Sequence, residues 1–325
     1  MDEVVVLCDR GVEGVLPENC RLRVFGAPTR PRRAARYVAA LVSELREAPL
    51  AVIGHMVPLY TVVAAPFVRA RGVPLLLWYT HWKNHVVLRM ANAVCTHMLS
   101  LDERSFPLRS RKLHGIGHGI DLAEFPCQPP NPAAGRPFRV ISLGRYSRPK
   151  RLDEMVEGVR IVRERGVDAR IDLYGTTGSP AEESYKRELE ALVARPGYSE
   201  FASVGGPTPR TQLPPIYAAA DVVASDFISP DKIVLEACSS CRPVLASHEA
   251  FDTLFAGIEP PLAFERDRPE TFADRIQALA ALGDEERHAI GRELRERVSR
   301  QHSVETWADA ILGLAGGVSE RRPGA

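Results

Sequence analysis

The chain has 325 residues, 45% of them hydrophobic and 26% charged, which is typical of a soluble globular protein, and its length favours two domains. Its formal net charge of +1 excludes a general electrostatic attraction to nucleic acid or membranes, so any such attraction requires a local patch. The longest apolar stretch, residues 57–68, is too short to span a bilayer, and no secretory signal is predicted at the N-terminus.

Apolar runs and helical patterns alternate over the first hundred residues. Strands are predicted at residues 4–8, 22–25, 50–54, 73–79 and 94–99, and helices at 33–46, 59–71 and 86–93. The apolar runs show no alternation of polar and apolar residues, and helices separate them. This combination predicts a parallel sheet covered on both faces, as in α/β proteins.

Four arginines, Arg30, Arg32, Arg33 and Arg36, lie at the start of the first of these helices. A basic run in such a place is most often a solvated helix start. The alternative is contact with an anionic lipid or with a phosphorylated acceptor. The sequence leaves both interpretations open.

A proline-dense stretch, residues 125–132, cannot continue a helix or a strand and predicts a domain linker. A second alternation follows, with strands predicted at 138–143, 171–174, around 204 and at 220–225, and helices at 152–162, 183–193 and 213–220. Beyond residue 264 helices dominate, and the last is predicted to begin after Ser303. The predicted domains are 1–125 and 138–302, joined by a linker at 126–137 and followed by a C-terminal helix at 303–316.

The cysteines give information about the cellular compartment. Six of them are scattered along the chain, several in apolar runs, which predicts buried thiols in a reducing compartment and no disulfide. Cys238 and Cys241 form a CxxC motif, but no further metal ligands lie nearby at a suitable spacing. We therefore predict structural packing for this pair and a cytoplasmic location for the protein.

Residues 229–240 combine a helix start with an isolated carboxylate. Ser229 can cap the helix, Pro230 suits its first position, and Asp231 favours the positive end of the helix dipole. The strand predicted just before this segment places the helix start at the carboxyl edge of a parallel sheet, where phosphorylated ligands bind. Glu236 lies in mid-helix among apolar residues, where a carboxylate needs a partner such as a ligand hydroxyl.

The turn after the first strand of the second domain contains Gly144, Arg145 and Lys150. It is expected at the same sheet edge as the helix that begins near Pro230. Two cations facing a helix N-terminus would form a diphosphate site that neutralises a departing nucleotide. A solvated basic turn explains the same residues equally well, because this motif is weak on its own.

Several segments of the chain occur together in an ordered series. They are Gly144-Arg145 with Lys150, Leu173-Tyr174-Gly175, residues 201–205 and 217–222, Val234-Leu235-Glu236-Ala237 with Arg242-Pro243-Val244, and Gly117-His118-Gly119-Ile120-Asp121 with Phe125. This series resembles retaining glycosyltransferases of glycosyltransferase family 4, in which Asn usually stands in place of His118. The resemblance covers roughly residues 50–312 and is more specific than any single motif.

The resemblance implies a GT-B fold, in which two Rossmann-like, doubly wound parallel-sheet domains face a cleft. It implies that the C-terminal domain binds a nucleotide-diphosphate sugar, that the N-terminal domain binds the acceptor, and that the last helix crosses back to the first domain. Arg145 and Lys150 match the diphosphate clamp of the family, and Glu236 matches the carboxylate that binds the ribose hydroxyls. The residues implied in donor binding are Gly144, Arg145, Lys150, Gly175, Ser229, Asp231, Lys232 and Glu236.

His81 follows the strand predicted at 73–79 and matches the cleft histidine that the family places near the transferred sugar. A lone histidine at a strand end is more often structural, but the resemblance favours a catalytic role beside Arg145 and Lys150. His55 occupies the equivalent place after the preceding strand and is its rival. The acceptor-side residues are predicted to be His55, Trp82 and His118. Front-face attack, in which the leaving phosphate accepts the proton, implies no enzymic nucleophile, and the fold implies no metal or other cofactor.

Two features depart from the family pattern. The register of the first of two family glutamates falls on Ile228, so Asp231 or Asp226 is a candidate for binding a sugar hydroxyl, unless Asp231 only starts the helix. By comparison with the family, we expect the first strand, the glycine-rich turn and the helix of the N-terminal domain to be missing, about sixty residues in total. Either the start was trimmed, or a partner or an altered topology covers the gap.

The predicted function is that of a hexosyltransferase that moves a sugar from a nucleotide-diphosphate donor to a hydroxyl of a glycan, a lipid or a small molecule. Two alternatives are a weak or inactive binding subunit with the GT-B fold and another GT-B enzyme, such as a sugar-nucleotide epimerase. The predicted partners are the nucleotide sugar and the acceptor, and not nucleic acid. Peripheral membrane association and a lipid-linked acceptor both stay open.

Overall fold

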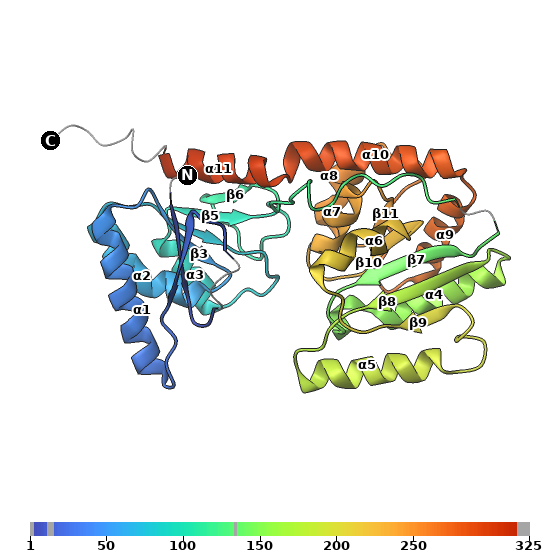
Figure 1. Ribbon diagram of the computed structural model, residues 1–325, viewed down its shortest axis with the longest axis horizontal. Coiled ribbons are helices and arrows are strands. Elements are labelled where there is room, and N and C mark those ends of the chain that lie inside the picture. Colours follow the sequence, from blue (N-terminus) through green and yellow to red (C-terminus); the bar gives the residue numbers. More distant parts are fainter. Residues whose placement is uncertain (1–2, 12–15, 133–134, 317–325) are drawn as a thin grey trace. The chain divides into compact units, whose positions relative to one another are not determined.

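The computed structural model describes residues 3–11, 16–132 and 135–316 of the chain. The chain divides into two compact units, each containing parallel β-sheet (Figure 1). The first unit comprises the chain up to Gly115 with the segment from Ala310 on, and the second comprises Ile116 to Asp309. The proline-dense stretch predicted as a linker belongs to the second unit. No described helix is long and apolar enough to cross a membrane.

In its described residues, the first unit has two parallel sheets instead of the single sheet predicted. Its strands are β1 (Val4–Cys8), β2 (Cys20–Val24), β3 (Val52–His55), β4 (Leu75–Trp78), β5 (His97–Ser100) and β6 (Leu113–Gly115). β1 pairs with β2, and the other strands form a sheet in the order β3-β4-β5-β6. The prediction of one sheet is wrong because β1 and β3 do not pair with each other. The alternating helices are α1 (Arg30–Glu44), α2 (Pro58–Ala70) and α3 (Val86–Val94), as predicted apart from their exact ends.

Both sheets of the first unit lie against one hydrophobic core. Leu75, Leu77 and Met98 of the four-stranded sheet are buried in it, and Leu7 of β1 packs against the same cluster. All four residues of β4 are buried, which explains the continuous apolar run at this strand.

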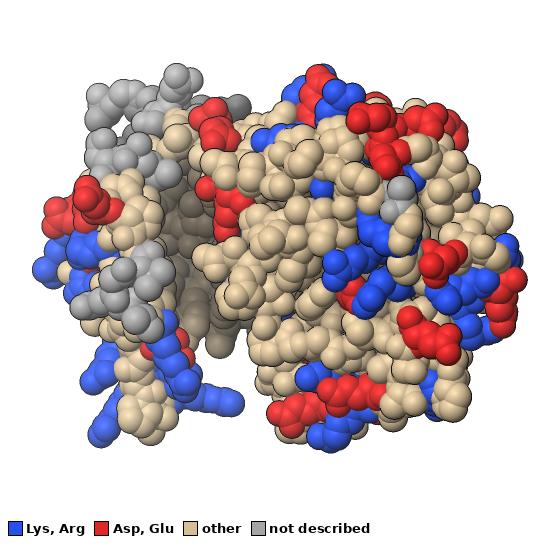
Figure 2. Space-filling model, turned by 45° about the vertical axis from the view of Figure 1, so that its right-hand side comes forward, with Lys and Arg blue, Asp and Glu red and all other residues tan. Residues whose placement is uncertain are grey.

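In the space-filling view, Lys and Arg side chains gather at the lower end of this unit (Figure 2).

The second unit contains a five-stranded parallel sheet in the order β11-β10-β7-β8-β9. Its strands are β7 (Phe138–Leu143), β8 (Ala169–Tyr174), β9 (Ala202–Val204), β10 (Val222–Ser225) and β11 (Val244–Ala246). The strand order reverses between β7 and β10. The carboxyl ends of these two strands are therefore the topological switch point of a doubly wound sheet, the place where such sheets bind ligands.

Helices accompany the strands of the second unit as predicted. They are α4 (Leu152–Glu164), α5 (Pro180–Val193), α6 (Leu213–Ala218), α7 (Lys232–Ser239), α8 (Asp252–Phe255), α9 (Pro269–Ala280) and α10 (Asp284–Gln301). The last helix, α11 (Val304–Gly316), begins after Ser303, whose Oγ accepts a hydrogen bond from the Thr306 backbone N–H at 3.1 Å. The predicted start of this helix is therefore confirmed, and Ser303 caps it.

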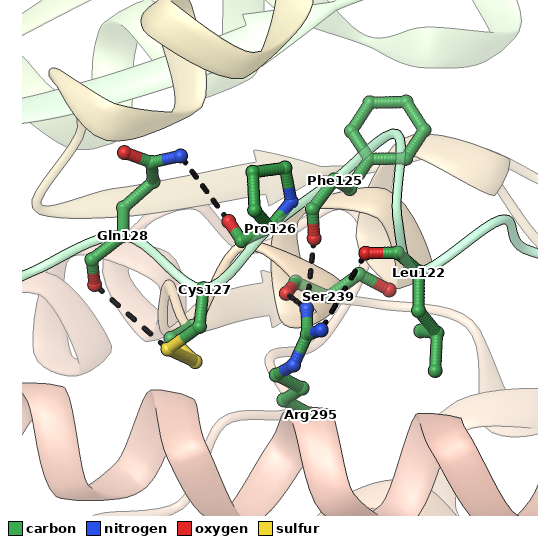
Figure 3. Close-up of a disulfide and its surroundings, with 8 residues drawn as sticks. Leu122, Phe125, Pro126, Cys127, Gln128, Ser239 and Arg295 are labelled. Atoms are coloured by element: carbon green, nitrogen blue, oxygen red, sulfur yellow. Dashed lines mark hydrogen bonds between the residues drawn. A yellow bond between two sulfur atoms is a disulfide. The ribbon is translucent and has the colours of Figure 1, made fainter.

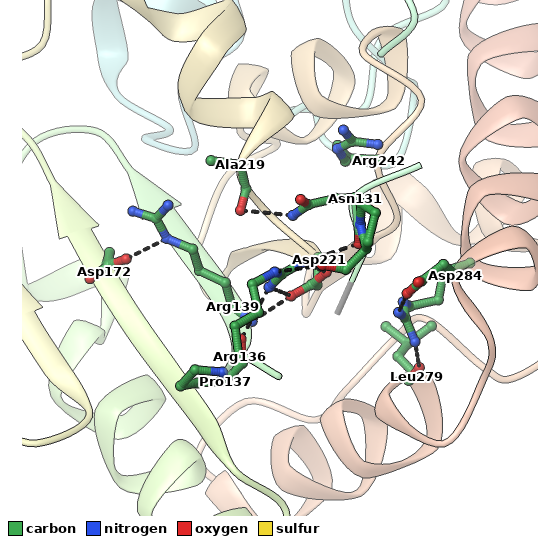
Figure 4. A network of polar contacts seen from close by, with 12 residues as sticks. Asn131, Arg136, Pro137, Arg139, Asp172, Ala219, Asp221, Arg242, Leu279 and Asp284 are labelled. Carbon is green, nitrogen blue, oxygen red and sulfur yellow. Dashed lines mark hydrogen bonds and ion pairs between the residues drawn. The ribbon is translucent and has the colours of Figure 1, made fainter. Parts of the chain in front are cut away.

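A buried carboxylate links the strands at the amino end of this sheet (Figure 4). Asp221 has a side chain that is 1% exposed, and it accepts two hydrogen bonds from the Arg136 guanidinium at 2.6 and 2.8 Å. The backbone N–H of Arg139 donates to it as well, at 2.7 Å. The side chain of Arg139 in turn pairs with Asp172 of β8 at 2.6 Å. Charges on three chain segments thus hold β7, β8 and β10 together.

A disulfide fastens the start of the second unit to the segment after α7 (Figure 3). It joins Cys127 to Cys241, whose Cα atoms lie 4.9 Å apart. The prediction that the chain has no disulfide is therefore wrong. The two cysteines are separated by 114 residues, and only the folded chain brings them together.

Arg295 of α10 lies next to this disulfide (Figure 3). Its guanidinium donates hydrogen bonds to the backbone carbonyl oxygens of Phe125, at 2.8 Å, and of Ser239, the last residue of α7. It also donates to the carbonyl of Leu122 at 3.4 Å. One side chain thus binds the entering chain and the end of α7 at the same time.

Replacing Cys127 by serine is expected to lower the free energy of unfolding by about 2–4 kcal/mol, because the cross-link restricts the unfolded chain. Cys127 is the exposed partner of the pair, so the serine buries no new polar group. Equilibrium urea denaturation with and without dithiothreitol measures the effect. The reductant should destabilise the wild type and leave the Cys127→Ser variant unchanged. Equal responses of the two proteins would show that the disulfide does not form.

Candidate active site

Two loops meet at the switch point of the second unit. Gly144 follows β7 and Asp226 follows β10, and these strands pair in parallel through Val140 and Val222. Gly144 has a φ of 129°, a conformation that favours glycine. A Cβ atom at this position would lie 2.4 Å from Nζ of Lys150. Glycine at 144 therefore leaves the room that the lysine side chain occupies.

Lys150 is buried beside the start of α7. Its Nζ lies 2.5 Å from Oδ2 of Asp231 and donates a hydrogen bond to the carbonyl of Leu143 at 2.9 Å. Only 9% of its side chain is exposed. An ammonium group carries three protons, so these two bonds leave one for a further acceptor. The arrangement can present this N–H to an anion at the first turn of α7.

The helix α7 begins two residues later than predicted. Its first residue is Lys232 and its N-cap is Asp231, not Ser229. The carboxylate of Asp231 makes no capping bond, because it accepts hydrogen bonds from Lys150 and, at 2.9 Å, from Ser225 Oγ. Ser229 is buried in the loop before the helix. The predicted cap by Ser229 is therefore wrong, whereas the helix end still lies at the switch point.

The two predicted clamp cations point to different partners. Arg145 has a side chain that is 66% exposed, and it pairs with Glu182 of α5 at 3.1 Å. Glu182 also accepts a hydrogen bond from the backbone N–H of Gly178 at 2.6 Å. Lys150 is therefore in place next to α7, whereas Arg145 is bound to α5.

Glu236 is buried in α7 with protein partners already in place. It is 3% exposed, and burial raises its pKa above the ordinary value. Tyr217 donates a hydrogen bond to it at 2.9 Å, and Arg210 donates another at 3.2 Å. Lys232 lies one helical turn away, with its Nζ 3.9 Å from the carboxylate. The buried carboxylate predicted from the sequence is confirmed, but its partners here are side chains.

Sequence reasoning assigned no role to Arg210. Its guanidinium joins Glu236 to Glu124, at 3.2 and 2.5 Å respectively, and lies over the ring of Phe125 at 5.2 Å from the centroid. The turn that contains it shows no motif, so nothing in the sequence pointed to it. Tyr217 could have been found from the sequence, because it is the first residue of the Tyr-Ala-Ala-Ala-Asp segment, which is part of the family resemblance.

Asp226, the other candidate for a sugar hydroxyl, is also engaged. It is 3% exposed, and burial raises its pKa. Ser247 donates a hydrogen bond to it at 2.6 Å and Arg151 another at 3.1 Å. Ile228, which stands at the register of the first family glutamate, is 39% exposed. These contacts give Asp226 a structural role in fixing the loop.

Gly175 lies directly against the loop after β7. A Cβ atom there would lie 1.8 Å from the carbonyl oxygen of Gly144, so no larger residue fits without a shift of the backbone. Beside it, the Tyr146 hydroxyl donates to the carbonyl oxygens of Leu173 and Gly205, at 3.0 and 2.7 Å. The carboxyl ends of β7, β8 and β9 are thereby held together.

His81 and Trp82 lie in the loop that follows β4 in the first unit. The backbone N–H of Lys83 donates to Nδ1 of His81 at 3.1 Å, and the imidazole stacks on the indole with ring centroids 5.5 Å apart. Trp82 is 40% exposed. His55 ends β3, which is the neighbour of β4, so both histidines lie at the carboxyl edge of the same sheet.

His118 lies in the second unit, between two glycines with positive φ. Gly117 approaches the chain so closely that a Cβ atom would lie 2.2 Å from the carbonyl oxygen of Gln301. The backbone N–H of Ile120 donates to the backbone carbonyl of His302 at 2.7 Å. This segment is therefore packed against the junction of α10 and α11. Among the described residues, no group of three or more His, Cys, Asp or Glu side chains could hold a metal ion.

Part of the second unit is similar to a known protein family. Residues 137–281, which contain the switch point, match the family described as glycosyl transferases group 1. No curated protein sequence matches the chain at a significant level.

Solved structures of glycosyltransferases share the fold. HepE of Anabaena in complex with UDP is 18% identical, with a TM-score of 0.75 over 92% of this chain and 86% of that one. Sucrose-phosphate synthase of Thermosynechococcus elongatus is 17% identical, with a TM-score of 0.75 over 94% and 85%. A glycosyltransferase of Rickettsia africae is 12% identical, with a TM-score of 0.75 over 98% and 90%. The chain therefore has the GT-B fold with two Rossmann-like units. Residues 137–281 of its second unit match the glycosyl transferases group 1, which supports the interpretation of this protein as a glycosyltransferase.

Proposed function

We propose that the protein transfers a sugar from a nucleotide-diphosphate donor to a hydroxyl acceptor with retention of anomeric configuration, as in glycosyltransferase family 4. The observation that carries the proposal is the buried Lys150 ammonium at the first turn of α7, at the switch point of the sheet. HepE, which shares the fold, has been solved with UDP and with UDP-glucose. A nucleoside diphosphate is therefore the ligand class that we assign to this edge.

The donor diphosphate occupies the first turn of α7 in this proposal. The backbone N–H groups there and the positive end of the helix dipole attract phosphate oxygens, and the third proton of Lys150 binds one of them. Arg145, whose side chain is exposed, exchanges Glu182 for an outer phosphate oxygen. These groups stabilise the charge that develops on the leaving diphosphate, so the proposed reaction needs no metal.

The transfer itself follows front-face attack. The acceptor hydroxyl attacks the anomeric carbon as the bond to the diphosphate breaks, and the leaving phosphate oxygen takes the hydroxyl proton. We assign His81 to the transferred sugar, and His55, Trp82 and His118 to the acceptor. The acceptor is the hydroxyl of a glycan, a lipid or a small molecule, and the proposed transferred sugar is a hexose.

Replacing Glu236 by alanine is expected to weaken donor binding by about 1–3 kcal/mol, because the carboxylate would no longer accept the ribose hydroxyls. Calorimetry with UDP, GDP, ADP and their sugar conjugates measures the effect. Glu296→Ala, an exposed substitution on α10, is the matched control and should bind as the wild type does. An unchanged affinity in Glu236→Ala would remove this residue from the site.

The proposed function is tested by incubating the preferred nucleotide sugar with and without a set of hydroxyl acceptors. Release of the nucleotide together with a new glycoside of the same anomeric configuration supports the proposal. Conversion of the nucleotide sugar without any acceptor would instead indicate an epimerase. Tight binding with no reaction under any condition would indicate a binding subunit.

A further inference from the structure

The charges of the chain are divided unequally along its length. Residues 1–115 contain 16 Lys and Arg and 9 Asp and Glu, whereas the remaining residues contain 26 and 32. Residues 51–100 contain four basic residues and no acidic ones. The net charge of the whole chain is only +1 because the acidic excess in the second unit compensates for the basic excess in the first. A basic surface of this kind attracts anionic partners.

Part of this positive charge lies where it opposes helix stability. Arg30, Arg32 and Arg33 belong to the first turn of α1, and this turn contains no acidic residue. Cations at a helix N-terminus interact unfavourably with the helix dipole. Arg33 is held by the carbonyl of Ala27 and by Asp9, whereas Arg30 and Arg32 are exposed. The helix itself thus gains nothing from these charges, which suggests that they bind an external anion.

Large apolar side chains are exposed in the two loops after β3 and β4 and in the helices that follow. They are Val57 (44% exposed), Leu59 (56%), Trp82 (40%), Val86 (69%) and Met90 (48%). β3 and β4 pair in parallel, and the backbone N–H of Met56 donates to the carbonyl of Trp78 at 2.8 Å. The two loops therefore emerge side by side. Lys83 lies over the Trp82 ring at 5.3 Å from its centroid, so a cation accompanies the aromatic side chain.

An aromatic cluster brings the arginines and these apolar residues to the same end of the unit. Phe25, which follows β2, lies 5.2 Å from the ring of Tyr60 in the first turns of α2. Tyr37 of α1 donates a hydrogen bond to the carbonyl of Tyr60 at 3.1 Å. Arg36, one turn into α1, donates to the carbonyl of Gly26 at 2.6 Å. The middle of α1 thus packs against the first turn of α2, and Arg71 at the end of α2 donates to the carbonyl of Leu45 at the end of α1 at 3.3 Å. The two helices therefore run in the same direction, and the first turn of α1 lies at the same end of the unit as the start of α2.

We propose that this end of the first unit docks on an anionic lipid bilayer. Its cations contact the headgroup phosphates, and Trp82, Val86 and Met90 enter the boundary between headgroups and acyl chains. Charge alone would suit any polyanion, but the exposed apolar side chains gain free energy only where hydrocarbon is available. Trp beside Lys is also the combination that favours a membrane interface. Docking itself does not depend on the proposed transferase activity, but Trp82 can have this role together with its proposed acceptor role only if the acceptor lies at the membrane surface.

The test is co-sedimentation of the full chain with vesicles of phosphatidylcholine, with and without phosphatidylglycerol. We expect binding only when phosphatidylglycerol is present, and weaker binding at high salt. The double variant Arg30→Ala/Arg32→Ala should lose affinity by roughly fivefold for each arginine. Its matched control is Arg268→Ala/Arg300→Ala, which removes two exposed arginines of the second unit and should leave binding unchanged.

A second pair of variants separates a bilayer from a soluble polyanion. Leu59→Ser/Val86→Ser should also weaken vesicle binding, whereas Leu50→Ser should not. Leu50 is 54% exposed but lies at the amino end of β3, at the other edge of the sheet. Absence of binding to any vesicle would overturn the proposal. So would binding that depends on the arginines alone and is matched by soluble polyphosphate. Circular dichroism of each variant confirms that it is folded.

Discussion

Replacing Lys150 by alanine should lower turnover by roughly a hundredfold to a thousandfold, which is the usual effect of removing one preorganised donor to a developing anion. The loss in donor affinity should be smaller, because the ammonium binds the departing diphosphate more strongly than the intact donor. Steady-state kinetics for turnover and calorimetry for donor binding measure the two effects separately. Equal losses in both would show that Lys150 binds only the ground state.

A control is needed because Lys150 also neutralises a nearly buried charge. Its partner Asp231 has a side chain that is 12% exposed, and removal of one member of a buried ion pair costs about 3–5 kcal/mol of stability. The double variant Lys150→Ala/Asp231→Asn removes both charges and should regain much of that stability. If turnover recovers together with stability, the effect of Lys150 is structural. If turnover stays low in a stable protein, the ammonium itself acts on the reaction.

Replacing Asp221 by alanine should lower the free energy of unfolding by about 3–5 kcal/mol. The substitution leaves the Arg136 guanidinium and the backbone N–H of Arg139 without their shared acceptor (Figure 4). Equilibrium urea denaturation at neutral pH measures the loss. Donor affinity of the folded fraction should be unchanged, since Asp221 lies at the end of the sheet opposite the switch point.

The matched control is Asp274→Ala. Asp274 pairs with Arg165 at 2.7 Å, but its side chain is 54% exposed, and exposed pairs contribute only about 0–1 kcal/mol. A loss of similar size in both variants would mean that burial does not determine the strength of these pairs. A small loss in both would mean that water reaches Asp221.

Local pattern was enough to predict most elements of the fold. β7 occupies the residues predicted for it, because its apolar residues Val140, Ile141 and Leu143 are buried in a sheet that helices cover. β6 was missed, since Leu113-His114-Gly115 contains a single apolar residue and becomes a strand only by pairing with β5. The division of the first unit into two sheets also depends on pairing between distant strands, which local pattern does not show.

The location of the candidate site could be predicted, but its contacts could not. Parallel topology brings the carboxyl ends of β7 and β10 together, and this places Gly144, Lys150 and the start of α7 at one edge. The pairs Lys150–Asp231 and Arg210–Glu236 join residues 81 and 26 positions apart. Such pairs depend on side-chain packing across loops. This is why the engagement of Asp231 and Glu236 by cations appeared only in the structure.

Arg295 and the Cys127–Cys241 disulfide attach α7 to the chain segment with which the second unit begins. α7 carries Glu236 in its middle, and its last carbonyl is held by the same guanidinium that holds Phe125. The position of α7 is therefore tied to the chain segment with which this unit begins. Any substitution that disturbs Arg295 or the disulfide would also disturb the helix that carries Glu236, although both lie away from the switch point.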